Sequence, residues 1–355
     1  MNQLKPIPRK RLGARGPIVG ALGLGCVNLT GLYGERVDRP TAISAVNDAI
    51  DVGMTLFDTA DSYGANHANE IFVGEAIASR RDEVAVSTKF GVLSGESSVG
   101  TTTGGIRDAV RGDYEYVRSS CEASLKRLGV EAIDVYYLHR PDPKVPIEET
   151  VGAMGELVEQ GKVRHVGLCE PSAATLRRAH ATYPITALQS EWSLFTRDIE
   201  TAVLPVAREL GVGIVPFAPL GRGFLTGKIK SLDDLPSDDA RRSMPRFENQ
   251  NFERNLAIVD EISAVAAEKG CTPAQVALAW LCAQGQDVVP IPGSDRPELV
   301  AENAASTFVD LTTQDLARID LTIPRGAAVG DRYSDMSWAE ADTPALVEGS
   351  SPTGG

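Results

Sequence analysis

The sequence has few cysteines, no long apolar run and no excess of basic residues, and each absence argues against a class of protein. Its five cysteines (Cys26, Cys121, Cys169, Cys271 and Cys282) are odd in number and show no CxxC spacing, which predicts neither a disulfide framework nor a zinc site. No stretch of roughly 18 apolar residues occurs, and no apolar region follows the N-terminal charges, so neither a membrane span nor an export signal is predicted. These features predict a reducing, cytoplasmic setting.

The acidic character of the chain argues against a nucleic-acid or membrane partner. Its 48 acidic and 35 basic residues give a formal net charge of -13 at pH 7. A phosphate backbone or an anionic lipid surface would repel such a chain. With 355 residues, of which 43% are hydrophobic, the chain can bury a large core. We therefore expect a small-molecule partner, and the sequence is compatible with a monomer or a homo-oligomer.

Short apolar strands alternate with amphipathic helices along most of the chain. Strands are predicted at residues 21–25, 54–58, 84–89, 133–138, 163–168, 187–190, 213–217 and 288–291. Helices are predicted at residues 41–52, 68–79, 114–128, 147–159, 173–182, 199–210, 253–269 and 297–304. Eight such repeats favour a closed parallel (β/α)8 barrel, the α/β TIM-barrel fold. An open doubly wound sheet is the competing architecture, although no glycine-rich turn follows the first strand in the spacing of a dinucleotide fold.

Four segments lie outside this alternation of strands and helices: a hairpin, two long insertions and a C-terminal tail. Residues 10–19 predict a small N-terminal β-hairpin that closes the lower mouth of the barrel. Residues 91–113 and 222–252 are long insertions, and the loops at the C-terminal strand ends of a barrel surround its active site, so both are predicted substrate walls. We expect residues 1–325 to form a single domain and residues 326–355 to form a polar, partly disordered tail.

Four side chains suited to proton transfer lie at the ends of three consecutive predicted strands: Asp58, Tyr63, Lys89 and His139. A tyrosine with a pKa near 10 is a poor acid at neutral pH unless its anion is stabilised. Lowering that pKa by two units requires about 2.7 kcal/mol, which a nearby ammonium such as Lys89 can supply in a partly dry site. Asp58 would hold Lys89 charged, and His139 would donate to a substrate oxygen. Taken alone, each residue is better explained by a structural role, such as a buried ion pair or a core side chain. Taken together, the four residues predict protonation of a carbonyl oxygen.

The motifs around these residues resemble those of the aldo-keto reductase family. The matching segments, in the family's order, are residues 57–64 (FDTADSYG), 88–89 (TK), 138–140 (LHR), 188–191 (LQSE), 219–223 (PLGRG) and 291–294 (IPGS), within residues 10–322. The chain is most similar to bacterial and plant members that reduce aldehydes, including the pyridoxal-type and perakine-type reductases. The resemblance implies an NADPH-dependent barrel enzyme that reduces an aldehyde or ketone to the alcohol, with Tyr63 as the general acid.

The same resemblance implies a set of cofactor-binding residues. Gln189 matches the residue at the nicotinamide carboxamide, and Phe217 matches an aromatic ring that stacks on the nicotinamide. Backbone N–H groups and positive charge suit the pyrophosphate, and the matching loop comprises Leu220, Gly221, Arg222, Gly223 and Lys228. Gly25 and Cys26 are expected beside the nicotinamide, Ser294 and Arg296 at the 2′-phosphate, and Asn303 at the adenine. Asp58 and Gly293 complete the expected cofactor-binding set.

Two positions depart from the family pattern. Cys169 stands where the family usually has a serine that donates to the carboxamide, and a thiol is a weaker donor. Asp295 lies beside Arg296 and would partly offset its charge, so NADPH is favoured over NADH without being exclusive. The alternative function is a nicotinamide-bound regulatory subunit with little turnover. A metal-dependent barrel hydrolase is disfavoured because no histidine and carboxylate cluster occurs at the predicted strand ends.

Overall fold

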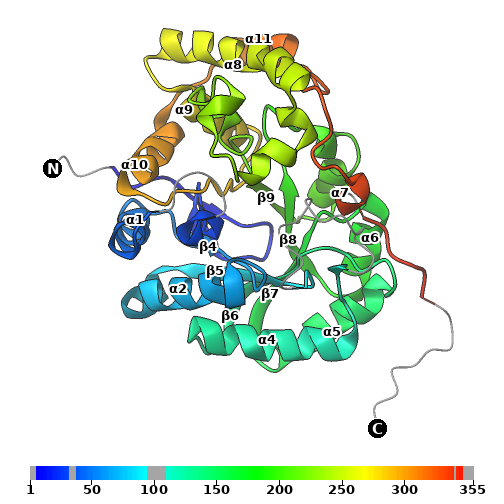
Figure 1. Cartoon of the computed structure of the whole chain (residues 1–355). Coiled ribbons are helices and arrows are strands. Elements are labelled where there is room, and N and C mark those ends of the chain that lie inside the picture. The colour runs from blue at the N-terminus through cyan, green and yellow to red at the C-terminus, as the bar shows by residue number, and fades with distance from the viewer. Residues whose placement is uncertain (1–4, 32–36, 94–108, 340, 347–355) are drawn as a thin grey trace.

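The computed structural model describes residues 5–31, 37–93, 109–339 and 341–346, and its strands form a nearly closed parallel barrel ringed by helices (Figure 1). Each barrel strand pairs in parallel with the next strand in the sequence. In order they are β3 (Leu24–Gly25), β4 (Leu56–Asp58), β5 (Ala85–Phe90), β6 (Ile133–Leu138), β7 (Val163–Cys169), β8 (Ile185–Glu191) and β9 (Gly213–Phe217). The predicted TIM-barrel class is therefore confirmed, and the open-sheet alternative is wrong.

Helices connect the strands and cover the outer face of the barrel (Figure 1). They are α1 (Arg39–Asp51), α2 (Ala68–Ile77), α4 (Tyr114–Leu128), α5 (Ile147–Glu159), α6 (Ala173–Thr182), α7 (Val203–Glu209), α8 (Asn249–Lys269), α9 (Pro273–Ala283), α10 (Pro297–Ala305) and α11 (Thr313–Thr322). The sequence does not predict α9 or α11. Helix α9 is buried along most of its length and therefore lacks a polar face, although the capping box of Thr272 with Gln275 marks its start. Within the described ranges, no helix is long and apolar enough to cross a membrane.

The predicted eighth strand at residues 288–291 is wrong as a regular strand. This segment instead closes the barrel between β9 and β3 through isolated contacts. The backbone N–H groups of Val289 and Ile291 donate to carbonyls of β9, and the carbonyls of Pro290 and Pro292 accept hydrogen bonds from the segment around β3. Because proline has no N–H, Pro290 and Pro292 cannot return a hydrogen bond to β3, and the ladder remains one-sided.

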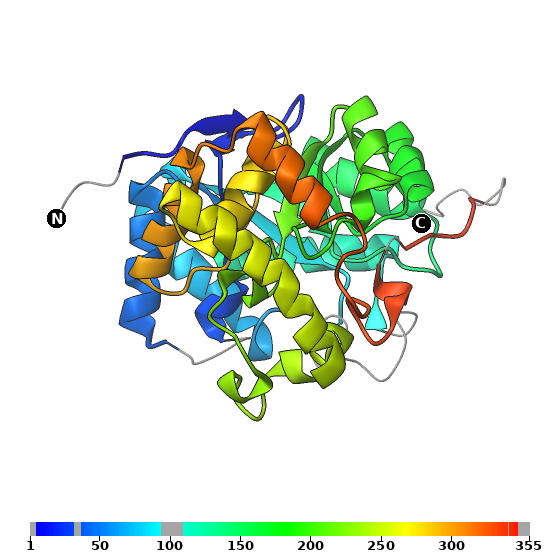
Figure 2. The ribbon, with the colours of Figure 1, turned by 90° about the horizontal axis from the view of Figure 1, so that it is seen from above.

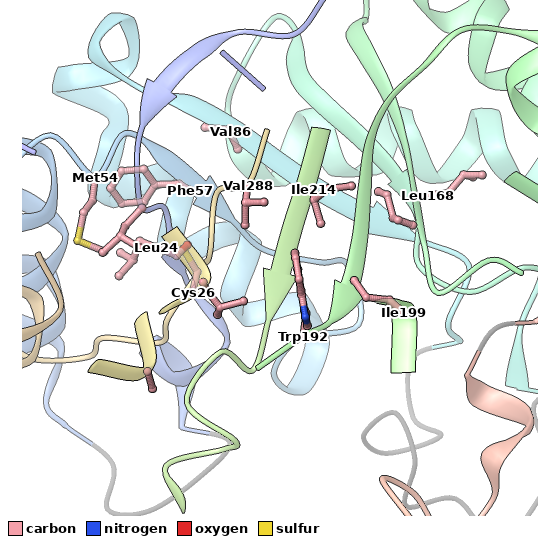
Figure 3. Packing of buried hydrophobic residues seen from close by; sticks show 14 of the residues in the cluster. Leu24, Cys26, Met54, Phe57, Val86, Leu168, Trp192, Ile199, Ile214 and Val288 are labelled. Atoms are coloured by element: carbon pink, nitrogen blue, oxygen red, sulfur yellow. The ribbon is translucent and has the colours of Figure 1, made fainter. Parts of the chain in front are cut away.

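Side chains of the strands alternate between the barrel interior and the layer beneath the helices. The interior cluster includes Leu56, Val135 and Val215, which are fully buried. Neighbouring residues such as Phe57 and Ile214 belong instead to the outer layer, part of which is seen in Figure 3. This period of two therefore fixes which residues at the C-terminal strand ends face the interior.

The predicted N-terminal hairpin is confirmed. Strand β1 (Arg9–Arg11) pairs antiparallel with β2 (Ile18–Gly20), and the hairpin lies at one end of the barrel (Figure 2). Leu12 and Val19 are fully buried and belong to the interior cluster. Gly13, with a φ of 64°, lies against the backbone of the first residue of β9, where a side chain would clash. The hairpin therefore closes the barrel at the N-terminal ends of its strands.

Part of the segment expected to form a polar tail lies against the barrel. Tyr333 and Trp338 are buried, and the guanidinium of Arg332 donates to both carboxylate oxygens of Glu170, at 3.1 and 2.9 Å. The extreme tail at residues 347–355 lies outside the described residues, as do residues 94–108 of one predicted substrate wall. The division of the chain into one domain and a tail stays a prediction.

Two helical glycines provide a matched test of this packing. A Cβ at Gly74 in α2 would lie 2.3 Å from the carbonyl oxygen of Leu128 in α4, whereas no described residue of another element lies within 4 Å of a Cβ at Gly152 in α5. Alanine favours a helix over glycine by about 1 kcal/mol, but overpacking costs about 1–3 kcal/mol. We expect Gly74→Ala to lower the midpoint of urea denaturation and Gly152→Ala to raise it. Shifts of the same sign would contradict the close approach of α2 and α4.

Candidate active site

The fold brings the four predicted catalytic residues to one end of the barrel. Asp58 is the last residue of β4, Lys89 lies near the end of β5, and His139 directly follows β6. Parallel strands carry their C-terminal ends to the same edge, and the period of two turns these side chains toward the barrel axis. Tyr63 reaches the same place from the loop after β4 and contacts Lys89 and His139.

Lys89 is the centre of this arrangement. It is fully buried, and its Nζ donates to Asp58 Oδ2 at 2.5 Å, to the carbonyl oxygen of Thr59 at 2.8 Å and to Tyr63 Oη at 3.1 Å. All three ammonium protons therefore have acceptors. Burial alone would lower the pKa of Lys89, but the charge of Asp58 and further partners outweigh burial and raise it. Lys89 is held as a cation.

The carboxylate of Asp58 is held in place by two hydrogen-bond donors besides Lys89. Its Oδ1 accepts hydrogen bonds from Ser87 Oγ at 2.7 Å and from Gln189 Nε2 at 2.8 Å, while Oδ2 accepts from Lys89. Residues of β4, β5 and β8 thus meet at one buried carboxylate. A carboxylate with this many donors has little freedom to move, so it fixes the position of the ammonium as well as its charge.

The pKa of Tyr63 is shifted in the direction opposite to the sequence-based expectation. Removal of its hydroxyl from bulk water raises the pKa to about 12, and the charge of Lys89 offsets only part of this effect. The phenol is therefore protonated at neutral pH. Its oxygen accepts from Lys89, and its ring lines a cavity at the barrel mouth, so its own proton can be donated to a ligand in that cavity.

His139 is buried as a neutral imidazole. Burial, together with the charges of Arg140 and Lys89, lowers its pKa well below the usual value. Its ring packs edge-on against Tyr63, with centroids 5.7 Å apart. Nδ1 lies 3.4 Å from Ser62 Oγ. When Ser62 donates to Nδ1, the ring proton is on Nε2, where it can be donated to a ligand oxygen.

The cavity above these residues has a volume of about 1140 Å³. Most of the predicted cofactor positions line it, namely Gly25, Cys26, Asp58, Gln189, Phe217, Leu220, Arg222, Gly223, Lys228, Gly293, Arg296 and Asn303. The structure therefore brings together residues from both ends of the sequence, as the resemblance implies. The insertion after β9, one of the two predicted substrate walls, contributes part of this lining.

Three predicted cofactor positions do not line the cavity. Cys169 is buried in the barrel interior, where burial raises its thiol pKa to about 12. Ser294 Oγ accepts a hydrogen bond from Asn303 Nδ2 at 2.8 Å. The backbone N–H of Gly221 donates to a carbonyl within its own loop, as does that of Gly223. The loop thus uses these N–H groups internally, and the cofactor roles of all three positions stay predictions.

Sequence reasoning missed many of the residues that line the cavity, among them Asn28, Arg140 and Tyr333. Asn28 lies in a short 3-10 helix after β3, Arg140 directly follows His139, and Tyr333 comes from the segment expected to be a tail. The position of Arg140 inside the Leu-His-Arg motif was a signal for it. No local pattern indicates Tyr333, because its contact with the barrel mouth depends on how the C-terminal segment packs.

The profile of the Aldo/keto reductase family matches residues 21–323. The chain belongs to this family. A curated relative, "Probable aldo-keto reductase 1" of Glycine max, is 46% identical over 348 residues, which cover 96% of each chain. Carbonyl-group oxidoreduction with a nicotinamide cofactor is therefore the general activity of this aldo/keto reductase.

Solved structures of two family members share the fold. A thermostable aldo-keto reductase, solved with the inhibitor epalrestat, superposes with a TM-score of 0.70 at 27% identity and covers 89% of this chain and 100% of its own. The glycerol dehydrogenase of Gluconobacter oxydans superposes with a TM-score of 0.77, also at 27% identity, over 91% of this chain and 96% of its own.

The residues of the cavity fit a nicotinamide cofactor. Phe217 supplies an aromatic ring at the mouth of the barrel. The buried Oδ1 of Asn28 has no partner among the described residues, so it is an acceptor that an N–H of a ligand can satisfy. Arg222, Lys228 and Arg296 line the cavity and bring positive charge that suits phosphate groups.

Two further carboxyl groups are buried nearby, that of Asp61 in the loop that carries Tyr63 and that of Glu70 at the start of α2. Glu70 accepts hydrogen bonds from Thr88 Oγ1 at 2.6 Å and from Arg127 Nε at 2.5 Å. Asp61 Oδ1 has no hydrogen-bond partner in the described part of the chain. Burial, followed by the charge of Glu70, raises the pKa of Asp61 to about 8. Asp61 is therefore protonated at neutral pH.

This raised pKa makes the contribution of Asp61 to stability depend on pH. An aspartate in the unfolded chain has a pKa of about 3.9, so between about pH 4 and pH 8 the folded protein keeps a proton that the unfolded chain has lost, and stability falls as pH rises. Asparagine mimics the protonated form. We expect Asp61→Asn to raise the thermal midpoint, relative to wild type, more at about pH 8.5 than at about pH 5.

The exposed Asp310 provides the control for this experiment. Asp310→Asn should shift the midpoint little and by the same amount at both pH values. A difference between Asp61→Asn and wild type that is constant across pH would contradict a protonated Asp61.

Proposed function

We propose that this aldo/keto reductase uses NADPH to reduce an aldehyde or ketone to the alcohol, with Tyr63 as the proton donor. The observation that carries this proposal is the position of Lys89, whose buried ammonium contacts Asp58 on one side and Tyr63 Oη, 3.1 Å away, on the other. A charged group held in contact with a phenol at a cavity wall is suited to stabilise the phenolate formed during proton transfer.

The nicotinamide, when bound, supplies the hydride that the carbonyl carbon accepts. Tyr63 Oη then gives its proton to the oxygen as negative charge develops there. An alkoxide is a much stronger base than a phenolate, so this transfer is favourable even from a phenol with a pKa of about 12. Lys89 stabilises the phenolate that remains, and Asp58 holds Lys89 in place. Neutral His139 orients the carbonyl by donating from Nε2.

The proposed preference for NADPH depends on Arg296. Its side chain lines the cavity beside α10 and is 34% exposed, so it can contact a phosphate while remaining partly solvated. Its Nε donates to Asp295 Oδ1 at 3.2 Å, which supports the expectation that Asp295 offsets part of its charge. Arginine binds phosphate through a planar fork of N–H groups, and NADH has no phosphate at the matching position.

Tyr63→Phe tests the proton donor. The change deletes one hydroxyl and keeps the ring, so we expect kcat for reduction of a generic aldehyde to fall by about 100-fold or more while NADPH affinity stays within about twofold. Steady-state assays of NADPH oxidation and a fluorescence titration of the cofactor measure the two quantities. Tyr183→Phe, at the distant end of α6, is the control and should retain wild-type turnover. Wild-type activity in Tyr63→Phe would refute the assignment, and an inactive wild type would favour the regulatory alternative.

Arg296→Ala tests the cofactor preference. We expect the KM for NADPH to rise much more than that for NADH, with little change in kcat, because the lost contact is far from the reacting carbon. The NADPH preference should fall roughly 10- to 150-fold, and Asp295 favours the lower end of this range. Asp295→Asn is the matched variant and should strengthen the NADPH preference. Equal losses for both cofactors in Arg296→Ala would show that Arg296 supports the loop instead.

A further inference from the structure

Arg140 is a buried cation at the barrel mouth, and it has no acidic partner among the described residues. Its side chain is 2% exposed and lines the cavity. Nη1 donates to the carbonyl oxygen of His139 at 2.6 Å and Nη2 donates to Tyr333 Oη at 3.5 Å, while Nε has no hydrogen-bond partner in the part of the chain that the structure describes. No carboxylate of the described residues forms an ion pair with it. Its guanidinium interacts instead with two neutral oxygens and with the ring face of Phe217.

The other arginines near Tyr333 are paired with acids. Arg222 Nη2 lies 3.0 Å from Glu191 Oε2, and Arg332 binds both oxygens of Glu170. Both also stack on the Tyr333 ring, with guanidinium-to-centroid distances of 5.4 and 5.6 Å. Glu191 and Glu170 are thus already paired with other cations. An isolated buried charge is costly, and an anion in the cavity would relieve that cost.

The surroundings of Arg140 place such an anion beside the reacting atoms. Its guanidinium lies 5.8 Å from the ring centroid of Phe217, and it is bonded to the backbone of His139. His139 is the residue proposed to orient the carbonyl, and Tyr333 closes the cavity on the side of the C-terminal segment. An anionic group bound by Arg140 would therefore lie close enough to the reacting carbonyl to be part of the same substrate molecule.

We propose that Arg140 binds a carboxylate of the substrate, so that the preferred substrates are aldehydes or ketones that carry a carboxylate group. This inference rests on the proposed reduction and names a class of substrate for it. Arginine matches a carboxylate through parallel N–H donors, and here the unpartnered Nε and the weakly engaged Nη2 are the donors that remain for it. Tyr333 Oη adds a hydroxyl at the same place.

The experiment compares carboxybenzaldehydes with their methyl esters, which differ in charge at one position. For the better of the 3- and 4-carboxy isomers, we expect wild-type kcat/KM to exceed that of the ester by at least about tenfold, as for a charge-assisted contact. Arg140→Met should lower the ratio of the two kcat/KM values by at least about tenfold, and Arg140→Lys should retain part of it. The ratio cancels the intrinsic reactivity of each aldehyde and any general loss of activity.

Binding of the same pairs to the protein with NADP+, where no reduction occurs, separates this inference from the proposed reaction. Tighter binding of the carboxylate than of the ester, lost in Arg140→Met, would support the anion site even if reduction failed. No preference in wild type, or equal losses for acid and ester in Arg140→Met, would overturn it. A loss of NADPH affinity with an unchanged ratio would also overturn it, because Arg140 would then serve the cofactor.

Discussion

The ion pair between Lys89 and Asp58 is the interaction on which the rest of the site depends. Both groups are buried, and burying charge is favourable only when each one is paired and its hydrogen bonds are satisfied. The three protons of Lys89 and the oxygens of Asp58 all have partners, which come from β4, β5, β8 and the Tyr63 loop. The pair therefore ties these elements together at the barrel mouth, and the position of Tyr63 follows from it.

The same pair explains why a raised pKa suits Tyr63. Burial makes the phenolate unfavourable, while Lys89 offsets part of the cost without removing it. The phenol thus stays protonated in the resting site, and its anion is stabilised only as far as one fixed ammonium allows. A strongly lowered pKa would leave the residue ionised before a substrate arrived, and an ionised residue cannot donate a proton. The balance between burial and one cation therefore keeps the proposed acid protonated and available.

The sequence predicted the features that depend on local period and failed where distant segments meet. Asp58, Lys89 and His139 could be placed together because parallel strands end at one edge, whatever their loops do. The eighth strand was predicted from apolar residues, but the missing N–H groups of its prolines decide its hydrogen bonding. The sign of the Tyr63 pKa shift depends on burial, and the role of Tyr333 depends on the packing of the C-terminal segment. Neither burial nor the packing of distant segments can be derived from the spacing of residues along the sequence.

The charges around Tyr333 link the C-terminal segment to the cavity. Glu170 lies at the end of β7 and is fully buried, so it would be an uncompensated anion without Arg332. Neutralising this carboxylate favours docking of the segment onto the strand ends, and docking puts Tyr333 into the cavity wall beside Arg140. Among the described residues of this segment, no carboxylate forms an ion pair with Arg140, whose Nη2 donates instead to Tyr333 Oη at 3.5 Å. The Arg332–Glu170 pair thus holds a neutral hydroxyl, that of Tyr333, beside Arg140, and this arrangement agrees with the proposed anion site.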